Sequence, residues 1–215
     1  MVCAQAGSAT FRGVVHGRAA HAALRLQGVS AIDRYVEVHA ALHEHERRIN
    51  AAVEHPLMAE HELPYPISVG RLRAGEWSSQ VPDRAEFEGR AGVRVGETLA
   101  QARQGVQAAV AAVGGEPVRL EWSGGQFGSA QTSQDHPFVA LVRAAAGAEL
   151  GGEPACAGVT YGADMRLYAE RGIPCVMLGT SGLELAHAVD ERVPVADVER
   201  LARILARVLL RWNDG

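Results

Sequence analysis

The sequence predicts a mixed α/β protein, with a ferredoxin-like β-α-β-β-α-β domain over residues 1–123 and a partial α/β domain over residues 124–215. Strand and helix periodicities alternate in that order along the first domain, which is the first observation behind this prediction. The second is that the remaining residues contain one or two convincing strands, where a doubly wound α/β sheet normally has about five or six. We therefore expect the second domain to be incomplete.

The first half of the ferredoxin-like domain is predicted to contain a strand, a helix and a connector. The strand covers residues 8–17, and its residues on one face are Phe11, Gly13 and Val15. Ser30 is the expected N-cap of the helix, with Asp33 three residues later as a variant of the capping box. The apolar positions at helical spacing are Ile32, Tyr35, Val36, His39 and Leu42. Residues 54–66 form a connector that contains proline and histidine.

Two strands, a helix and a last strand complete this domain. One face of the next strand carries Ile67, Val69 and Arg71. The following strand, residues 84–90, has Ala85, Phe87 and Gly89 on one face and Glu86, Glu88 and Arg90 on the other. An amphipathic helix covers residues 97–113 and ends at two glycines. The last strand contains Val118, Leu120 and Trp122.

The partial α/β domain begins with a predicted hinge at residues 123–135, which are rich in glycine, serine and glutamine. Helices are expected at residues 137–150 and 165–171, followed by a buried strand at residues 173–178 and a glycine loop at residues 179–182. The chain closes with an amphipathic helix, whose apolar positions are Val198, Leu201, Leu205, Val208, Leu209 and Trp212.

Composition excludes several classes of protein. The formal net charge is -4 and no basic block occurs, which argues against nucleic acid as the main partner. No apolar run reaches the ~18–20 residues that a membrane span needs, and the N-terminus lacks the pattern of a signal peptide. The three cysteines, Cys3, Cys156 and Cys175, are odd in number and far apart. They fit a reducing cytoplasm better than a disulfide framework.

A few polar residues are candidates for chemistry, each beside a plainer interpretation. His187, in a loop before the last helix, is either a metal ligand or a surface histidine. Arg166 with Asp164 either binds a substrate carboxylate or forms a structural pair at a helix start. His21, in a turn of small residues, either donates to an oxyanion or is an ordinary loop histidine. The pair His39 and His43 has zinc-ligand spacing but is interpreted as helix surface.

These segments together resemble the amidohydrolase family of acetylornithine deacetylase, succinyl-diaminopimelate desuccinylase and aminoacylase. The matching segments, in family order and at about family spacing, are Val14-Val-His-Gly-Arg-Ala-Ala-His21-Ala-Ala, Trp77-Ser-Ser-Gln-Val-Pro-Asp-Arg84, Gly89-Arg90 with Gly96-Glu97, Gly162-Ala-Asp-Met-Arg166, Arg171-Gly-Ile-Pro174 and His187-Ala-Val-Asp-Glu191. They span nearly the whole chain, and their combination is specific although no single segment is.

The resemblance implies that residues 1–123 are a lid and dimerisation domain, through which two copies pair. It implies a catalytic domain that binds two zinc ions, with cobalt as a substitute, and a glutamate base that activates a bridging water. His21 would stabilise the oxyanion in a neighbouring site, and His187 would be one metal ligand. Asp164 and Arg166 would bind the substrate carboxylate, with Gly179 and Gly182 as further substrate-binding candidates.

The family's remaining metal ligands and its base precede the lid, and this chain starts just before the first lid strand. We therefore expect the C-terminal portion of a zinc-dependent N-acyl-amino-acid amidohydrolase, acting on a small carboxylate-bearing substrate when its metal site is complete and inactive as this chain alone. One alternative is a split enzyme, in which a separate chain supplies the N-terminal half. Another is a non-catalytic dimerisation or binding module.

Overall fold

The computed structural model describes residues 1–180, 185–186 and 188–213, and these form two compact units. The larger unit comprises residues 5–130 and 159–163. The smaller comprises residues 1–4, 131–158 and 164–215. No helix in the described part of the chain is long and apolar enough to cross a membrane. The assignment of residues 1–123 and 124–215 as functional domains stays a prediction.

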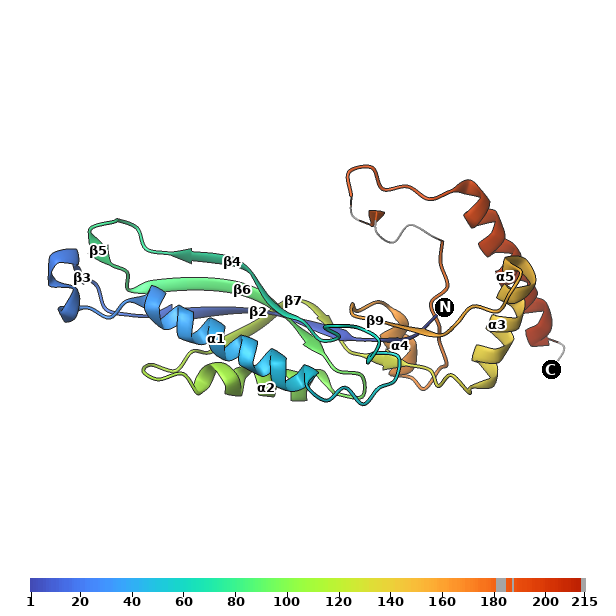
Figure 1. The fold of residues 1–215 in the computed structure, drawn as a ribbon, viewed down its shortest axis with the longest axis horizontal. Helices are drawn as coiled ribbons and strands as arrows, with labels where there is room; N and C mark the ends of the chain where they lie inside the picture. Colours follow the sequence, from blue (N-terminus) through green and yellow to red (C-terminus); the bar gives the residue numbers. More distant parts are fainter. Residues whose placement is uncertain (181–184, 187, 214–215) are drawn as a thin grey trace. The chain divides into compact units, whose positions relative to one another are not determined.

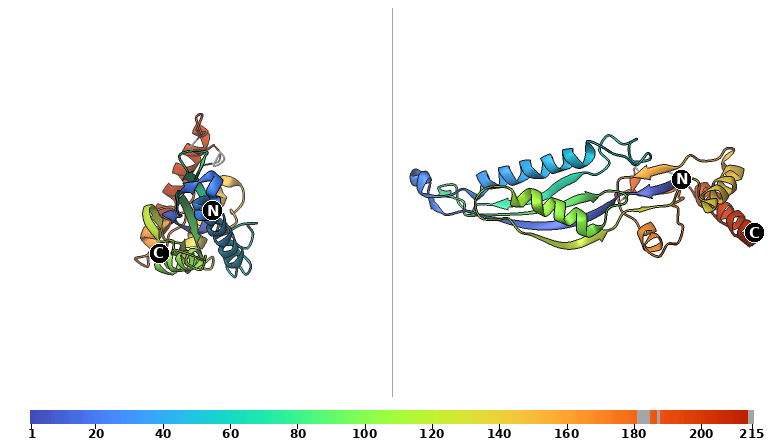
Figure 2. Two further views of the ribbon diagram at one scale, coloured as in Figure 1. Left: turned by 90° about the vertical axis from the view of Figure 1, so that its left-hand side faces the viewer. Right: turned by 90° about the horizontal axis from the view of Figure 1, so that it is seen from below.

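The larger unit contains the predicted succession of strands and helices (Figure 1). Its elements are β2 (Gly7–His16), β3 (Ala20–His21), the short 3₁₀ helix η1 (Ala22–Gln27), α1 (Ala31–Asn50), β4 (Ile67–Ala74), β5 (Gln80–Val81), β6 (Arg84–Val93), α2 (Leu99–Ala111) and β7 (Leu120–Phe127). The long strands form an antiparallel sheet in the order β4-β6-β2-β7. Helices α1 and α2 lie side by side against one face of this sheet (Figure 2).

Local signals start both helices, α1 at the predicted N-cap and α2 two residues after the predicted start. The Ser30 side chain accepts a hydrogen bond from the Asp33 N–H at 3.1 Å, and Thr98 with Gln101 forms a complete capping box before α2. The apolar face of α1 is partly different from the prediction, because Val38 is buried whereas Ile32 and Val36 are exposed. The face of α1 that packs on the sheet is therefore shifted from the predicted apolar face: it includes Val38 and excludes Ile32 and Val36.

The core of the larger unit depends on interlocking aromatic rings and glycines. Phe11 lies directly across the ladder from Gly89, and Phe87 lies across from Gly13. A Cβ atom built at Gly89 would lie 2.5 Å from the Phe11 ring, so the glycine leaves the space that the ring fills. Both rings are almost fully buried and contact each other edge to face, with centroids 6.2 Å apart. The predicted alternation along β2 and β6 is confirmed.

One strand face is inverted relative to the prediction. Strand β4 shifts register between Val69 and Arg71, so the alternation changes phase at Gly70. Arg71 therefore leaves the face of Ile67 and Val69 and pairs with Glu88 at 3.0 Å on the open face of the sheet. The result is a charged surface there, on which further Arg–Glu pairs involve Arg12, Arg84 and Glu86.

The predicted hinge is partly a strand. Residues 123–127 extend β7, which pairs with β2 across a register shift between Ala9 and Phe11. Gly124 has a positive φ of 70°, and Gln126 donates to the carbonyl oxygens of Thr10 and Ser123. The glycines that suggest flexibility in the sequence instead permit an irregular strand.

The smaller unit contains α3 (Pro137–Leu150), α4 (Met165–Ala169) and α5 (Val195–Asn213). It also contains most residues of the short strands β8 (Ala130–Gln131), β1 (Val2–Gln5) and β9 (Ala157–Val159), which form a second sheet in that order. Helix α3 has the predicted bounds and ends at Gly151, whose φ is 77°. Helix α5 packs on α3 through Ile204, which lies against Ala145 and Ala146. Glu149 on α3 also accepts hydrogen bonds from Arg203 and Arg207.

One prediction for the smaller unit is wrong and another is confirmed. Residues 173–178 do not form a buried strand: in the described chain their ladder contact is an isolated bridge between Met177 and Val2, and Ile173 is half exposed. A single bridge satisfies too few backbone groups to make a strand. Helix α5 is amphipathic as predicted, but several of its apolar side chains are exposed, namely Val198, Leu205, Leu209 and Trp212.

Candidate functional site

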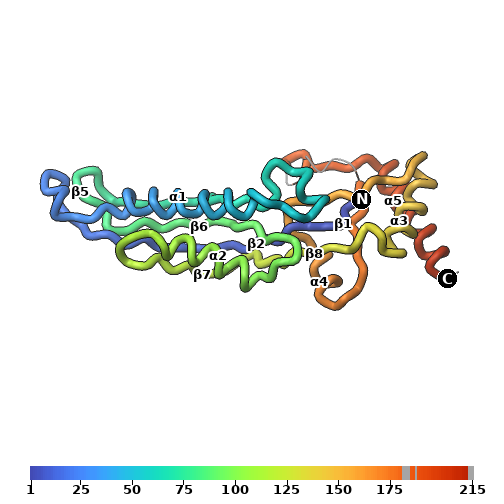
Figure 3. Tube along the Cα trace, turned by 60° about the horizontal axis from the view of Figure 1, so that its bottom comes forward, coloured from blue at the N-terminus to red at the C-terminus, as the bar shows by residue number. Residues whose placement is uncertain are grey.

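His21 lies at one end of the larger unit, in a two-stranded ribbon. Strand β3 pairs with β5, which sets His21 opposite Gln80, and the Ala22 N–H donates to the Ser79 carbonyl at 2.9 Å. Figure 3 shows this ribbon beyond the N-terminal end of α1. Gly17 is required where the chain enters it, because a Cβ atom there would lie 2.2 Å from the Val29 carbonyl oxygen.

The hydrogen bonds of His21 define what its ring can do. Its Nδ1 atom accepts from the Ala23 N–H at 3.1 Å, so the proton of the neutral ring is on Nε2. The side chain caps η1 and is exposed. An exposed Nε2–H donor on a fixed turn is the group that oxyanion stabilisation requires. The arrangement is compatible with the predicted role of His21, which stays a prediction.

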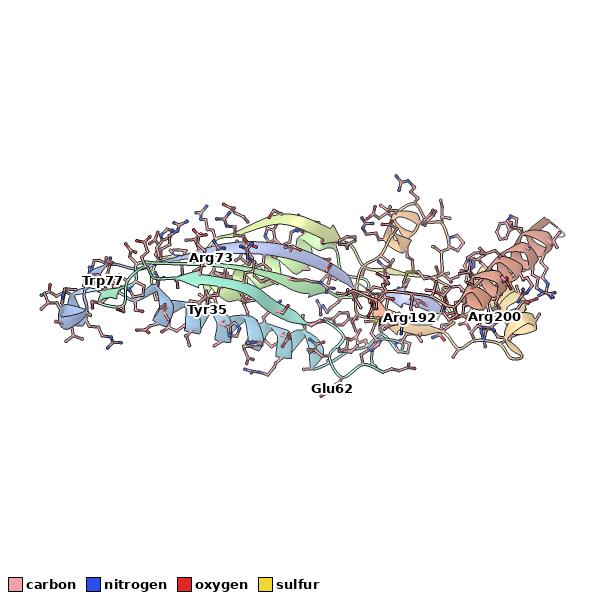
Figure 4. All side chains as sticks on the ribbon, turned by 90° about the horizontal axis from the view of Figure 1, so that it is seen from above. Tyr35, Glu62, Arg73, Trp77, Arg192 and Arg200 are labelled. Atoms are coloured by element: carbon pink, nitrogen blue, oxygen red, sulfur yellow. The ribbon has the colours of Figure 1, made fainter. Side chains whose placement is uncertain are left out.

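A cavity of about 320 Å³ lies beside this ribbon in the larger unit. Trp77, Gln80 and Arg84 are among its lining residues. Figure 4 shows the Trp77 side chain past the ends of the long strands, and 64% of this residue is exposed. Large exposed aromatic rings are typical of contact surfaces, so this end of the unit combines a proton donor with an apolar contact residue.

The turn that precedes Asp164 is held by a residue that sequence reasoning missed. Gln5 is fully buried, and its carboxamide makes two hydrogen bonds to Ala163: Nε2 donates to the carbonyl at 3.1 Å and Oε1 accepts from the N–H at 3.2 Å. Gly162 approaches Phe127 so closely that a Cβ atom would lie 2.5 Å from the Phe127 Cβ. Gln5 is a single amide side chain within a run of small apolar residues. This pattern could have indicated a buried side chain with hydrogen-bond partners, because buried amides need partners.

Asp164 and Arg166 form an ion pair at the start of α4, with Oδ1 and Nη1 3.3 Å apart. Arg166 is the more buried partner, with 17% of its side chain exposed against 79% for Asp164. Met165 between them is buried and anchors the helix. Both interpretations of the pair, a substrate clamp and a structural pair, are compatible with this geometry.

The remaining candidates lie in the glycine loop and after it. Gly179 lines a cavity of about 170 Å³ between α3 and α5, together with Arg200 and Ile204. Arg200 also pairs with Asp197 at 3.0 Å. Gly182 and His187 lie outside the described residues. The structure therefore leaves the predicted roles of these three candidates as predictions.

The donor side chains of the described residues do not form a metal site. Within residues 1–180, 185–186 and 188–213, no group of three or more His, Cys, Asp or Glu side chains could hold a metal ion. His39 and His43 contact each other edge to face, with centroids 4.4 Å apart. Burial, followed by the nearby His43, lowers the pKa of His39. The described residues by themselves do not fit a zinc or cobalt centre.

Comparison with known proteins defines the class. The model of peptidase family M20/M25/M40 matches residues 13–211, and the chain belongs to this family. A succinyl-diaminopimelate desuccinylase of Methylobacterium sp. (strain 4-46) is 43% identical over 77 residues, which are 36% of this chain and 19% of that protein. A second, from Methylobacterium nodulans, is 39% identical over 83 residues, 39% of this chain and 20% of that protein.

Solved structures show the same fold over nearly the whole chain. The aminopeptidase PepT of Bacillus cereus matches with a TM-score of 0.69 and 19% identity over 96% of this chain and 52% of that one. A dinuclear metal-binding M20 peptidase of Bacillus subtilis matches with a TM-score of 0.62 and 20% identity over 96% of this chain and 50% of that one. The chain therefore spans about half the length of these structures and has the mixed α/β fold of that half.

Proposed function

We propose that this chain is the C-terminal portion of a zinc-dependent N-acyl-amino-acid amidohydrolase of the deacetylase and desuccinylase type. The observation that carries the proposal is the family match over residues 13–211, together with the likeness to two succinyl-diaminopimelate desuccinylases. The complete enzyme would hydrolyse an amide in a small carboxylate-bearing substrate, in the cytoplasm. His21 would donate its Nε2–H to the oxyanion, and Arg166 would bind the carboxylate with help from Asp164.

As this chain alone the protein is expected to be inactive. A catalytic zinc site uses about three protein ligands, and the described residues contain no such group. The purified chain should therefore show no deacylation of N-succinyl or N-acetyl amino acids above the buffer rate, with zinc or cobalt added. Zinc-dependent turnover by the pure chain would contradict the proposal.

A separate chain that carries the other ligands and the base is the partner that would restore activity. Mixing this chain with the N-terminal half of a desuccinylase should produce zinc-dependent deacylation. His21→Ala and His187→Ala should each abolish it, whereas His43→Ala, on the exposed side of α1, should not. Restored activity that survives both substitutions would refute the assigned roles.

A non-catalytic dimerisation module is the second candidate. Ile32 and Val36 are exposed on α1, and β4 is an edge of its sheet, so the larger unit offers an apolar and strand-edge surface for a second copy. This function predicts a dimer in light scattering that zinc does not alter. Val36→Asp should dissociate the dimer and Glu37→Ala, an exposed neighbour, should not. A monomer at all concentrations would exclude it.

A further inference from the structure

Two of the three thiols, 153 residues apart in the chain, meet in the smaller unit. The Sγ atoms of Cys3 and Cys156 are 2.9 Å apart, and Cys3 donates its S–H to Cys156. Both cysteines are free thiols in the structure. We propose that Cys3 and Cys156 are a reversible redox modification site, which a low-molecular-weight disulfide oxidises to an intramolecular disulfide.

The backbone on both sides of Cys156 is fixed against the start of β1. The Met1 amino group donates to the Ala155 carbonyl at 3.0 Å, and the Ala157 N–H donates to the Met1 carbonyl at 2.9 Å. The two thiols are therefore held together by neighbouring hydrogen bonds. To form a bond of about 2.05 Å the sulfurs need to approach by only about 0.9 Å, within the reach of side-chain rotation.

Unequal exposure sets the order of the steps. Cys3 is fully buried and Cys156 is partly exposed, so Cys156 meets the oxidant first. Its thiolate attacks the oxidant RSSR, forms a Cys156–S–S–R mixed disulfide and releases RS⁻, which takes up a proton. The Cys3 thiol then loses its proton, its sulfur attacks the Cys156 sulfur, and the second RS⁻ leaves. The two thiols lose two electrons and two protons, and RSSR becomes two RSH.

The environment of Cys3 makes the second step slow and dependent on pH. Burial above all raises the pKa of Cys3 to about 12, and the Cys156 thiol adds to this. The positive charges near it, the Met1 amino group and Arg143 on α3, act in the opposite direction but are outweighed. Since the thiolate is the nucleophile, closure should accelerate roughly tenfold per pH unit between about pH 7 and 9. A site that closes slowly fits a cytoplasmic thiol pair that is normally reduced.

The disulfide would brace β1, which Thr132 connects to Cys175. The Thr132 N–H donates to the Cys3 carbonyl at 2.8 Å, and the Thr132 side chain bonds both the N–H and the carbonyl of Cys175. Through Thr132, β1 supports the residues 173–178 that lead to Gly179. Oxidation should therefore slow amide exchange in this segment as well as in β1.

The experiment treats the full chain with oxidised glutathione and counts thiols after denaturation. The reduced protein has three thiols; the oxidised monomer should have one, a mass lower by two hydrogen atoms, and a linked peptide that contains Cys3 and Cys156. Cys175→Ser should close equally well. Cys156→Ser should keep its Cys3 thiol, and dithiothreitol should restore the starting protein.

Three results would overturn the proposal. The first is a folded chain that keeps all its thiols under conditions that oxidise a model dithiol. The second is oxidation that yields dimers linked through Cys175. The third is a bridge between Cys3 and Cys175. Circular dichroism of each variant before oxidation shows whether it is folded, so that a loss of closure is attributed to the missing sulfur.

Discussion

Replacing Gln5 with leucine should destabilise the turn that presents Asp164 and Arg166. The two hydrogen bonds from Gln5 to Ala163, at 3.1 and 3.2 Å, are each worth about 1 kcal/mol net, and the third, to the Gly128 carbonyl at 3.5 Å, is long and adds little. Leucine of similar volume keeps β1 packed but leaves the Ala163 groups without that partner. Because Ala163 is partly exposed, water offsets part of the loss. The expected cost is about 2 kcal/mol.

Urea unfolding followed by circular dichroism should show this loss of free energy, and thermal unfolding should show a decrease in Tm of roughly 6 °C. Amide exchange supplies a second measurement, because the Ala163 N–H that Gln5 protects should exchange faster in Gln5→Leu. Gln134→Leu is the matched control, since Gln134 is exposed. If Gln5→Leu unfolds within about 0.5 kcal/mol of the wild type and the Ala163 amide stays protected, Gln5 does not hold the turn.

Three further predictions concern interactions within each unit and are checked by urea unfolding. Gly89→Ala should cost about 1–3 kcal/mol by overpacking against the Phe11 ring, whereas Gly70→Ala meets nothing within 4 Å and should be nearly neutral. Ile204→Ala should cost about 2–4 kcal/mol and Leu205→Ala, which is 52% exposed, less than half of that. Hydrogen bonds from two arginines lower the pKa of Glu149 from its usual value of 4.5. The stability that the ionised Glu149 contributes to the folded state is therefore present above that pH, and it disappears as the pH falls through the folded-state pKa. Glu149→Gln should therefore destabilise at pH 7, and its cost should decrease as the pH falls through the folded-state pKa of Glu149. Equal costs within a pair, or a Glu149→Gln effect independent of pH, would contradict these assignments.

Local patterns in the sequence were sufficient for most elements of the larger unit. Strand β6 has the predicted alternation from Ala85 to Arg90, and Ser30 caps α1, because each depends on neighbours within a few residues. The family could be inferred from the order of short segments, and residues 13–211 match it.

The sequence missed features that depend on a single irregularity. The bulge at Gly70 moves Arg71 to the opposite face of β4, because one inserted residue reverses every later side chain. Likewise, Gly124 and Gly125 read as hinge residues, yet they allow β7 to continue past a register shift. The glycines at both places indicate an irregular backbone, but the sequence does not show which strand lies beside them.

Periodicity and capping along the chain were enough to predict the alternation of strands and helices and the approximate helix starts, because these signals act between residues close in sequence. Contacts between distant residues were not predictable in this way. The pairing of Cys3 with Cys156 and of Gln5 with Ala163 joins segments more than 150 residues apart, and neither has a local pattern. Such contacts depend on how strands pack, and the same packing leaves residues 173–178 with one bridge instead of a buried strand.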